Sequence, residues 1–209
     1  MLQINKGREP SSLTAYRKKP YATYDGCNKA DIRRNLLVEQ GCLCAYCMRR
    51  IREDNMQIEH WYPESKLSEA EKLDYSNMFG VCTRSEGLEK RFATCDAKKG
   101  NTLMTLDPRR ADHIQTIKYE TATGRILSDN AKINHDLNET LNLNCEMQLL
   151  PQNRRAKLVE VLNQIKKMHP TGTWTAANIA PIRRLYENGR NGELPEYAGI
   201  VRWWLRKFP

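Results

Sequence analysis

Four cysteines between positions 44 and 95 have the chemistry of a metal site. Cys44 and Cys47 are separated by two residues, and two thiols at this spacing in a tight turn can both point at one tetrahedral ion. Cys82 and Cys95 would complete a closed set of four sulfur ligands, which is typical of structural zinc. Twelve residues separate this second pair, so an alternative is that both are simply buried thiols. We predict one structural Zn²⁺ bound by all four.

A second group of side chains in the same segment could hydrolyse a phosphodiester. That reaction needs a base to deprotonate water and a divalent cation to neutralise charge on the phosphate and the leaving oxygen. His60 could be the base, while Glu59 and Asp96 offer the hard oxygen ligands that Mg²⁺ or Mn²⁺ prefers. A lone histidine is more often an ordinary core or surface residue. Its neighbours in this segment are what favour a catalytic role.

Three polar residues complete the predicted site. Asn77 ends a loop signal, Asp74-Tyr-Ser-Asn77, where its amide could fix the loop or orient the imidazole. Lys98 and Lys99 follow Asp96 in a short helical turn and could contact phosphate. We therefore predict His60 and Asn77 as catalytic residues, with the two lysines binding nucleic acid.

Short elements are expected to position these groups. Met56 to His60 is predicted to be a strand that, if fully extended, places Glu59 and His60 on opposite faces, and Pro63 ends it. Four further elements are expected around it: a helix from Asp31 to Gln40, a short strand from Met48 to Ile51, a short helix capped by Ser65 or Ser68, and a helical turn from Thr94 or Cys95 to Gly100.

The second half of the chain is predicted to be a hairpin followed by helices. A strand from Ile114 to Glu120, a turn at Thr123-Gly124 and a return strand from Arg125 to Leu127 would form the hairpin. Helices are expected over Asn130 to Leu141, Pro151 to Met168, Ile179 to Tyr186 and Tyr197 to Phe208. The fold class is thus α+β and mostly helical. Its expected divisions are an N-terminal arm and helix (1–43), the core that carries the site (44–107), and the hairpin with a helical, basic C-terminal region (108–209).

The charge of the chain favours a polyanionic partner. The net charge is +9, and residues 151–209 hold 11 Lys and Arg against 4 Glu, which places +7 in that region. No run of about 18 apolar residues predicts a membrane helix, and the N-terminus lacks the apolar core of a signal peptide. A cytoplasmic location with reduced thiols is the default expectation. The remaining cysteines, Cys27, Cys42 and Cys145, are then ordinary thiols, although Cys42 lies close enough to Cys44 to substitute for it.

Two regions outside the predicted core could contact a partner. Residues 1–26 look irregular and interleave tyrosines with basic residues, which indicates either an arm packed on the surface or a contact with phosphate backbone or a partner. Near the C-terminus, the aromatic and basic stretch from Val201 to Phe208 could be a docking surface or a helix divided between core and solvent.

The arrangement of Glu59, His60, Asn77 and Asp96 beside the cysteines resembles the HNH endonucleases, which have a zinc-bound ββα-metal core. In that family an acid followed by His ends the first strand. The resemblance implies that His60 is the general base, Glu59 and Asp96 are metal ligands, and Asn77 organises the loop. Asp96 departs from the pattern, in which Asn or His is commoner, but a carboxylate is also a good ligand for a hard cation.

A closer resemblance is to the HNH subunit of Septu-type bacterial anti-phage systems. It is carried by motifs spanning roughly residues 40–155: Cys44-Ala-Tyr-Cys47-Met-Arg-Arg-Ile51, Ile58-Glu59-His60, Cys95-Asp-Ala-Lys-Lys-Gly-Asn101, Thr140-Leu-Asn-Leu-Asn144 and Arg154-Arg155. That subfamily works beside an SMC/ABC-like ATPase, in some systems with a retron reverse transcriptase and its small DNA–RNA hybrid. The resemblance implies an antiviral effector that a partner holds in check.

Two alternatives stay open at this point. The same fold could act as an RNase on host RNA such as tRNA, because activation of external water does not require or exclude a 2′-OH. The chain could also be a zinc-stabilised module that binds nucleic acid or a partner without catalysis. That alternative predicts that Glu59, His60 and Asp96 do not converge in space, within reach of one metal ion.

Overall fold

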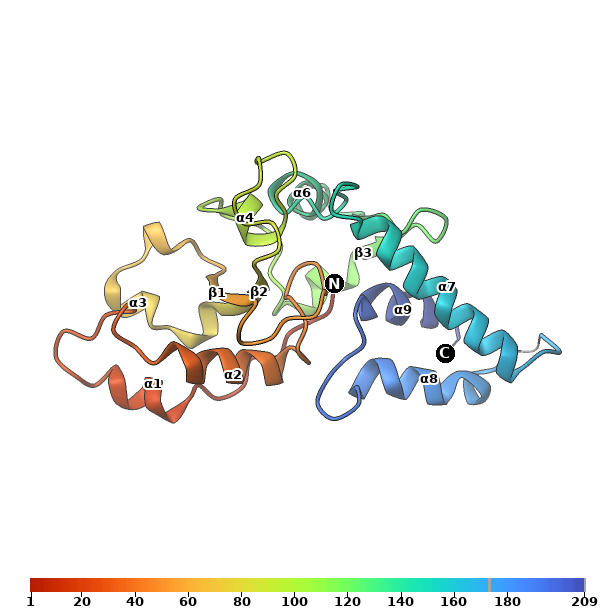
Figure 1. The fold of residues 1–209 in the computed structure, drawn as a ribbon, viewed down its shortest axis with the longest axis horizontal. Helices are drawn as coiled ribbons and strands as arrows, with labels where there is room; N and C mark the ends of the chain where they lie inside the picture. The colour runs from red at the N-terminus through yellow and green to blue at the C-terminus, as the bar shows by residue number, and fades with distance from the viewer. Residues whose placement is uncertain (173, 209) are drawn as a thin grey trace.

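The computed structural model describes residues 1–172 and 174–208 and is an α+β protein in which helices dominate. The strands β1 (Met56–His60) and β2 (Met78–Cys82) lie among the N-terminal helices, while α7, α8 and α9 group on the other side of the molecule (Figure 1). Buried apolar side chains from both groups belong to one hydrophobic cluster. Across the described residues, no helix has the length and apolar character needed to cross a membrane.

The predicted strand over Met56 to His60 is present with those bounds. It pairs antiparallel with β2, with Met56 opposite Cys82 and His60 opposite Met78. All five residues of β2 are buried, so this strand lacks the polar alternation that marks a half-buried strand in a sequence. The pairing brings the end of β1, which carries the predicted catalytic residues, next to the start of β2.

Two helices contact this strand pair: α2 (Lys29–Glu39), close to its expected bounds, and α4 (Cys95–Lys99), which contacts β2. Gln40 follows α2, and its buried amide donates to the carbonyls of Leu43 at 2.7 Å and Gly80 at 2.8 Å. The same amide accepts the Gly80 N–H at 2.7 Å. One side chain therefore ties the end of α2, the cysteine turn and β2 together.

Short helical segments shape the loops of this half. The expected helix near residue 70 is α3 (Glu69–Lys72), and Ser68 caps it through a reciprocal bond with Glu71. The turns η1 (Glu64–Lys66) and η2 (Tyr75–Asn77) are 3₁₀ helices on either side of it. Contrary to the irregular arm expected, α1 (Ser11–Tyr16) forms directly after Pro10.

Three expected elements differ from the structure. The segment from Met48 to Ile51 forms no strand but takes part in a single bridge, between Leu43 and Arg50. The first strand of the hairpin is shorter than expected, because α5 (Ala111–Gln115) precedes β3 (Ile117–Tyr119), which pairs with β4 (Ile126–Ser128). The next helix is α6 (Ala131–His135), which widens into the π-helical η3 (Asp136–Thr140), where the buried Asp136 carboxylate binds the backbone N–H groups of Thr105 and Leu106.

The hairpin turn is fastened to the long helix α7 (Leu150–Met168). Gly124 in the turn has φ +77°, and a Cβ there would lie 2.0 Å from the Pro151 carbonyl oxygen. Arg154 on α7 is buried and donates to the carbonyl oxygens of Gly124 at 2.7 Å and Leu143 at 2.9 Å, and to Asn144 Oδ1 at 2.9 Å. Burial lowers the pKa of Arg154 to about 10. The guanidinium thus joins the hairpin turn at Gly124 to the loop at Leu143 and Asn144 through hydrogen bonds alone.

The C-terminal helices α8 (Ala176–Asn188) and α9 (Ala198–Leu205) pack on each other and α9 packs on α7. Trp204 is buried, and its ring centroid lies 5.9 Å from that of Trp174 and 5.0 Å from that of Phe208. Trp203 is half-buried against Tyr119. These contacts favour a helix divided between core and solvent over an exposed aromatic docking surface.

Candidate active site and metal centre

The four predicted zinc ligands come together from three segments. Cys44 and Cys47 lie in the turn closed by the Leu43–Arg50 bridge, Cys82 ends β2 and Cys95 begins α4. Their Sγ atoms lie within 4.8 Å of one another, with separations of 3.6 Å for Cys47–Cys82, 3.8 Å for Cys44–Cys95 and 3.9 Å for Cys82–Cys95. A tetrahedral ion with Zn–S bonds of about 2.3 Å needs sulfurs about 3.8 Å apart. The cluster has the donor set and the dimensions to hold zinc.

The surroundings of the cluster also suit a cation. All four cysteines are buried, and burial raises the pKa of the Cys47 thiol, so four thiolates there need compensating positive charge. The loop between Cys82 and Cys95 is closed at its base, because Ser85 Oγ donates to the Thr94 carbonyl and accepts the Thr94 N–H, both at 3.0 Å. Among the described residues, Cys42 is not part of the four-sulfur group.

His60 is held in one orientation at the end of β1 and is 3% exposed. Its Nε2 lies 2.8 Å from the carbonyl oxygen of Lys72, the last residue of α3. A carbonyl oxygen only accepts hydrogen bonds, so Nε2 carries the proton and the neutral ring keeps its lone pair on Nδ1. Tyr24 packs edge-on against the ring at 4.7 Å, and Nδ1 lies 3.7 Å from a Glu64 carboxylate oxygen. The fold therefore selects the tautomer in which Nδ1 can act as a base.

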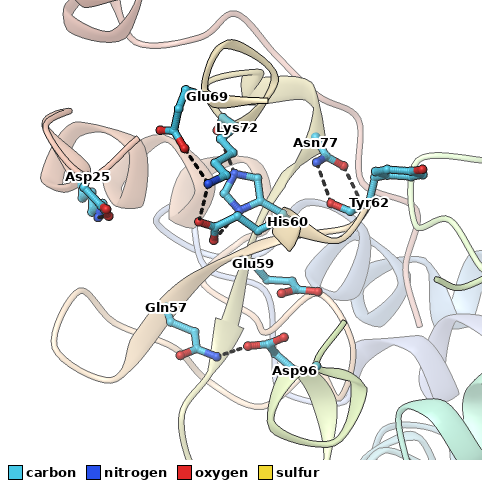
Figure 2. A network of polar contacts seen from close by, with 12 residues as sticks. Asp25, Gln57, Glu59, His60, Tyr62, Glu69, Lys72, Asn77 and Asp96 are labelled. Carbon is cyan, nitrogen blue, oxygen red and sulfur yellow. Dashed lines mark hydrogen bonds and ion pairs between the residues drawn. The ribbon is translucent and has the colours of Figure 1, made fainter. Parts of the chain in front are cut away.

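The carboxylates of Glu59 and Asp96 point toward one another from β1 and α4 (Figure 2). Glu59 is buried, and its Oε1 lies 2.6 Å from Lys99 Nζ and 3.4 Å from the Tyr46 hydroxyl. Asp96 accepts a hydrogen bond from the Gln57 side chain. Burial and the adjacent Asp96 raise the pKa of Glu59 to about 9, although Lys99 opposes this shift. Two carboxylates in this arrangement hold either a proton or a cation between them.

Asn77 acts on the chain that follows His60. Its side chain accepts the Tyr62 N–H at 2.8 Å and donates to the Tyr62 carbonyl at 3.1 Å, as Figure 2 shows. Its own carbonyl accepts the Trp61 N–H at 2.9 Å. These bonds fix the backbone where it leaves β1, directly after His60.

The two lysines of α4 have different environments. Lys99 is 2% exposed, and besides Glu59 its ammonium contacts the carbonyl oxygens of His60 at 3.2 Å and Gly100 at 3.3 Å. Lys98 is half-buried and donates to the Lys90 carbonyl at 3.0 Å. A phosphate contact requires an accessible amine, so the burial of Lys99 and its pairing with Glu59 do not favour the nucleic-acid contact expected for Lys99. The phosphate contact of Lys98 stays a prediction.

Glu59, His60 and Asp96 line one hollow of about 240 Å³, whose other walls include Glu64 and Asn101. Within the described part of the chain, only the cysteines form a group of three or more metal-binding side chains whose ligand atoms all lie within 4.8 Å of one another. Glu59, His60 and Asp96 thus share the lining of this hollow without forming such a group. The hollow brings two carboxylates and one imidazole together.

Several contributors to this site carried little sequence signal. Glu64 lies four residues after His60, a spacing that could have been noticed. Tyr24 and the Lys72 carbonyl reach His60 from other elements, and Tyr46 reaches Glu59 from inside the cysteine turn. Only the folded chain brings these groups to the site.

Comparison with known proteins relates about half of this chain to a named protein. No family model matches this chain. The chain is similar to a protein of Vibrio cholerae serotype O1 biovar El Tor that is named "Retron Vc95 putative HNH endonuclease", with 28% identity over 120 residues. The match covers 52% of this chain and 57% of the relative, so it spans about half of each protein. The similarity supports a distant relationship to HNH endonucleases.

Proposed function

We propose that this protein is a metal-dependent endonuclease of the HNH type that hydrolyses phosphodiester bonds of nucleic acid. The observation that carries the proposal is the hollow in which the Glu59 and Asp96 carboxylates face each other beside a histidine of fixed tautomer. Support for the proposal also comes from the antiparallel strands β1 and β2 with α4 packed on β2, an order of elements that a ββα core requires. The similarity to a protein named as an HNH endonuclease supports the same class.

His60 acts as the general base in this proposal. The Lys72 carbonyl keeps the proton on Nε2, so the Nδ1 lone pair is available to take a proton from water. Tyr24 prevents the ring from turning, and Asn77 fixes the backbone on its C-terminal side. The water to be activated would lie in the hollow, on the side where Nδ1 faces Glu64.

Glu59 and Asp96 would hold a divalent cation, Mg²⁺ or Mn²⁺. The residues fit such an ion, because burial and mutual repulsion already leave the pair in need of positive charge, and the donors are hard oxygens. When bound, the cation supplies charge neutralisation for the phosphate and the leaving oxygen. Lys99 orients Glu59 from the buried side, and the four cysteines with zinc fix the ends of β2 and α4.

The first test is cleavage by the purified, zinc-loaded protein. Plasmid DNA and total RNA would be incubated with Mg²⁺ or Mn²⁺, with His60→Ala, and with His135→Ala as a control at an exposed histidine on α6. Cleavage by the parent and the control, but not by His60→Ala with its zinc and melting temperature retained, is the expected result. An active His60→Ala protein would refute the base assignment. The polymer that is cut decides between a DNase and an RNase, and no cleavage with any partner would favour a non-catalytic binding module.

We also propose that the enzyme works in a cytoplasmic anti-phage system beside an SMC/ABC-like ATPase, with a retron reverse transcriptase and its DNA–RNA hybrid as further partners. The support is the resemblance of the sequence motifs to Septu-type subunits and the retron in the name of the relative. Co-expression and co-purification with an SMC/ABC-like ATPase of a Septu-type system tests this assembly. Cleavage that is suppressed in the complex and released on phage infection is expected, and failure of the two proteins to associate would contradict it.

A further inference from the structure

A second hollow, of about 590 Å³, lies between the N-terminal arm and α3. Figure 1 shows α1 and α3 on the same side of the β1–β2 pair. One wall is basic and aromatic, and the other comes from α3 and the residue after it. The side chains that matter are Arg17, Lys18, Lys19 and Tyr21 on the arm, and Glu69 and Ala70 on α3.

The charge of this hollow is positive. Lys18 and Lys19 are both exposed, and no ion pair involves either of them in the described part of the chain. Arg17 pairs with Glu9 at 2.8 Å, and Glu69 on the opposite wall is neutralised within α3 by a lysine at 2.7 Å. Two ammonium groups without an ion-pair partner among the described residues, at the mouth of a hollow, have the charge that attracts a phosphodiester backbone.

Tyr21, at the rim of the hollow, is not stabilised by burial in the fold. It is 98% exposed, and its backbone has φ +58°, in the left-handed region that non-glycine residues rarely adopt. A large aromatic ring held in water on a strained backbone points to a use in binding. Aromatic rings beside basic side chains are the platforms on which unpaired bases stack.

The arm and α3 also lead to the candidate active site. Tyr24, three residues after Tyr21, packs on His60, and α3 supplies the Lys72 carbonyl that fixes the same ring. We propose that this hollow binds single-stranded nucleic acid, with Lys18 and Lys19 on phosphates and Tyr21 stacked on a base. The inference deepens the proposed function by naming how the substrate strand approaches His60, but binding can be measured without cleavage.

The test is binding of fluorescein-labelled oligothymidylate and oligouridylate, followed by anisotropy over a range of salt concentrations without added Mg²⁺ or Mn²⁺. Lys18→Gln/Lys19→Gln should reduce the slope of log affinity against log salt by about 1.4, because each phosphate contact on a single strand contributes about 0.7. The pair Lys166→Gln/Lys167→Gln, adjacent exposed lysines on α7, is the matched control and should leave the slope unchanged.

Tyr21→Ala should weaken single-strand binding about 5- to 150-fold, the equivalent of one lost stack, while Tyr21→Phe keeps it. A duplex of the same length should lose much less on Tyr21→Ala. Single-strand binding unchanged in Tyr21→Ala, or equal losses in the two lysine pairs, would overturn the proposal and indicate a protein partner for this surface. The binding test and the nuclease test can fail independently. If the variants bind as predicted but the protein cleaves nothing, the nuclease proposal is refuted and the strand-binding proposal is not.

Discussion

Replacement of Lys99 by methionine should destabilise the protein strongly. The methionine keeps most of the packing volume but removes an ammonium that is 2% exposed, lies 2.6 Å from Glu59 and contacts two carbonyl oxygens. Above about pH 9, the raised pKa of Glu59, this carboxyl is ionised, and removal of its partner in the buried ion pair then costs about 3–5 kcal/mol, because the carboxylate stays in a medium of low polarity. Domains of this size have a free energy of unfolding of about 5–15 kcal/mol, so the variant would lose a large share of it.

Urea denaturation of zinc-loaded protein at about pH 10, above the pKa of Glu59, measures this loss directly. Lys98→Met is the matched control, since Lys98 is the next residue on the same helix and only half-buried, and it should change the free energy of unfolding by less than about 0.5 kcal/mol. Lys99→Met/Glu59→Gln should recover much of the stability, because the uncompensated carboxylate is gone. The reasoning would be refuted if Lys99→Met were as stable as Lys98→Met but bound nucleic acid more weakly. That result would mean that Lys99 contacts phosphate and does not form a buried ion pair with Glu59.

Three further predictions concern other parts of the molecule. Structural zinc contributes about 10–16 kcal/mol in small zinc domains, so Cys82→Ala should lower the melting temperature far more than Cys145→Ala. Cys145 is the control because it is a buried cysteine outside the cluster, and equal melting temperatures of the two variants would argue against a metal bound by the four cysteines. The pKa of Glu59 is raised to about 9, so below that pH a bound cation must displace a proton from this carboxyl. The apparent affinity for Mn²⁺ should therefore rise up to about tenfold per pH unit between pH 6 and 9. Calorimetry in two buffers should detect the released proton. Arg154→Lys should cost about 2–4 kcal/mol in urea denaturation, because one ammonium cannot reach all three oxygens that the guanidinium contacts, and a cost below about 1 kcal/mol would contradict this role.

Local signals in the sequence predicted the local structure of the site well. The strand predicted to stop at Pro63 is β1, and Ser68, one of the two serines expected to cap the next helix, is the N-cap of α3. The CxxC turn is also a property of neighbouring residues. The sequence spacing of Cys82 and Cys95 was a weaker signal, and the structure brings both sulfurs to the first pair.

What the sequence did not predict depends on long-range contacts. β2 is buried on both faces by α2, α4 and the cysteine turn, so its residues show no alternation. Lys99 has the polarity of a surface residue, and its burial follows from the position of Glu59 across the β1–α4 contact. The tautomer of His60 is fixed by a carbonyl twelve residues away, which no local pattern encodes.

The closed base of the loop between Cys82 and Cys95 makes this loop a convenient place to engineer the protein. Ser85 and Thr94 join the ends of this loop next to Cys82 and Cys95, so a change in the number of residues between Ser85 and Thr94 should not move the sulfur atoms. A Cβ added at Gly87 would meet no heavy atom of the described residues within 4 Å, so this position offers room for an inserted epitope or fluorophore tag. Doubling the length of such a loop costs only about 0.6 kcal/mol of closure entropy. The protein could thus carry a reporter close to its candidate site, to follow strand binding in real time.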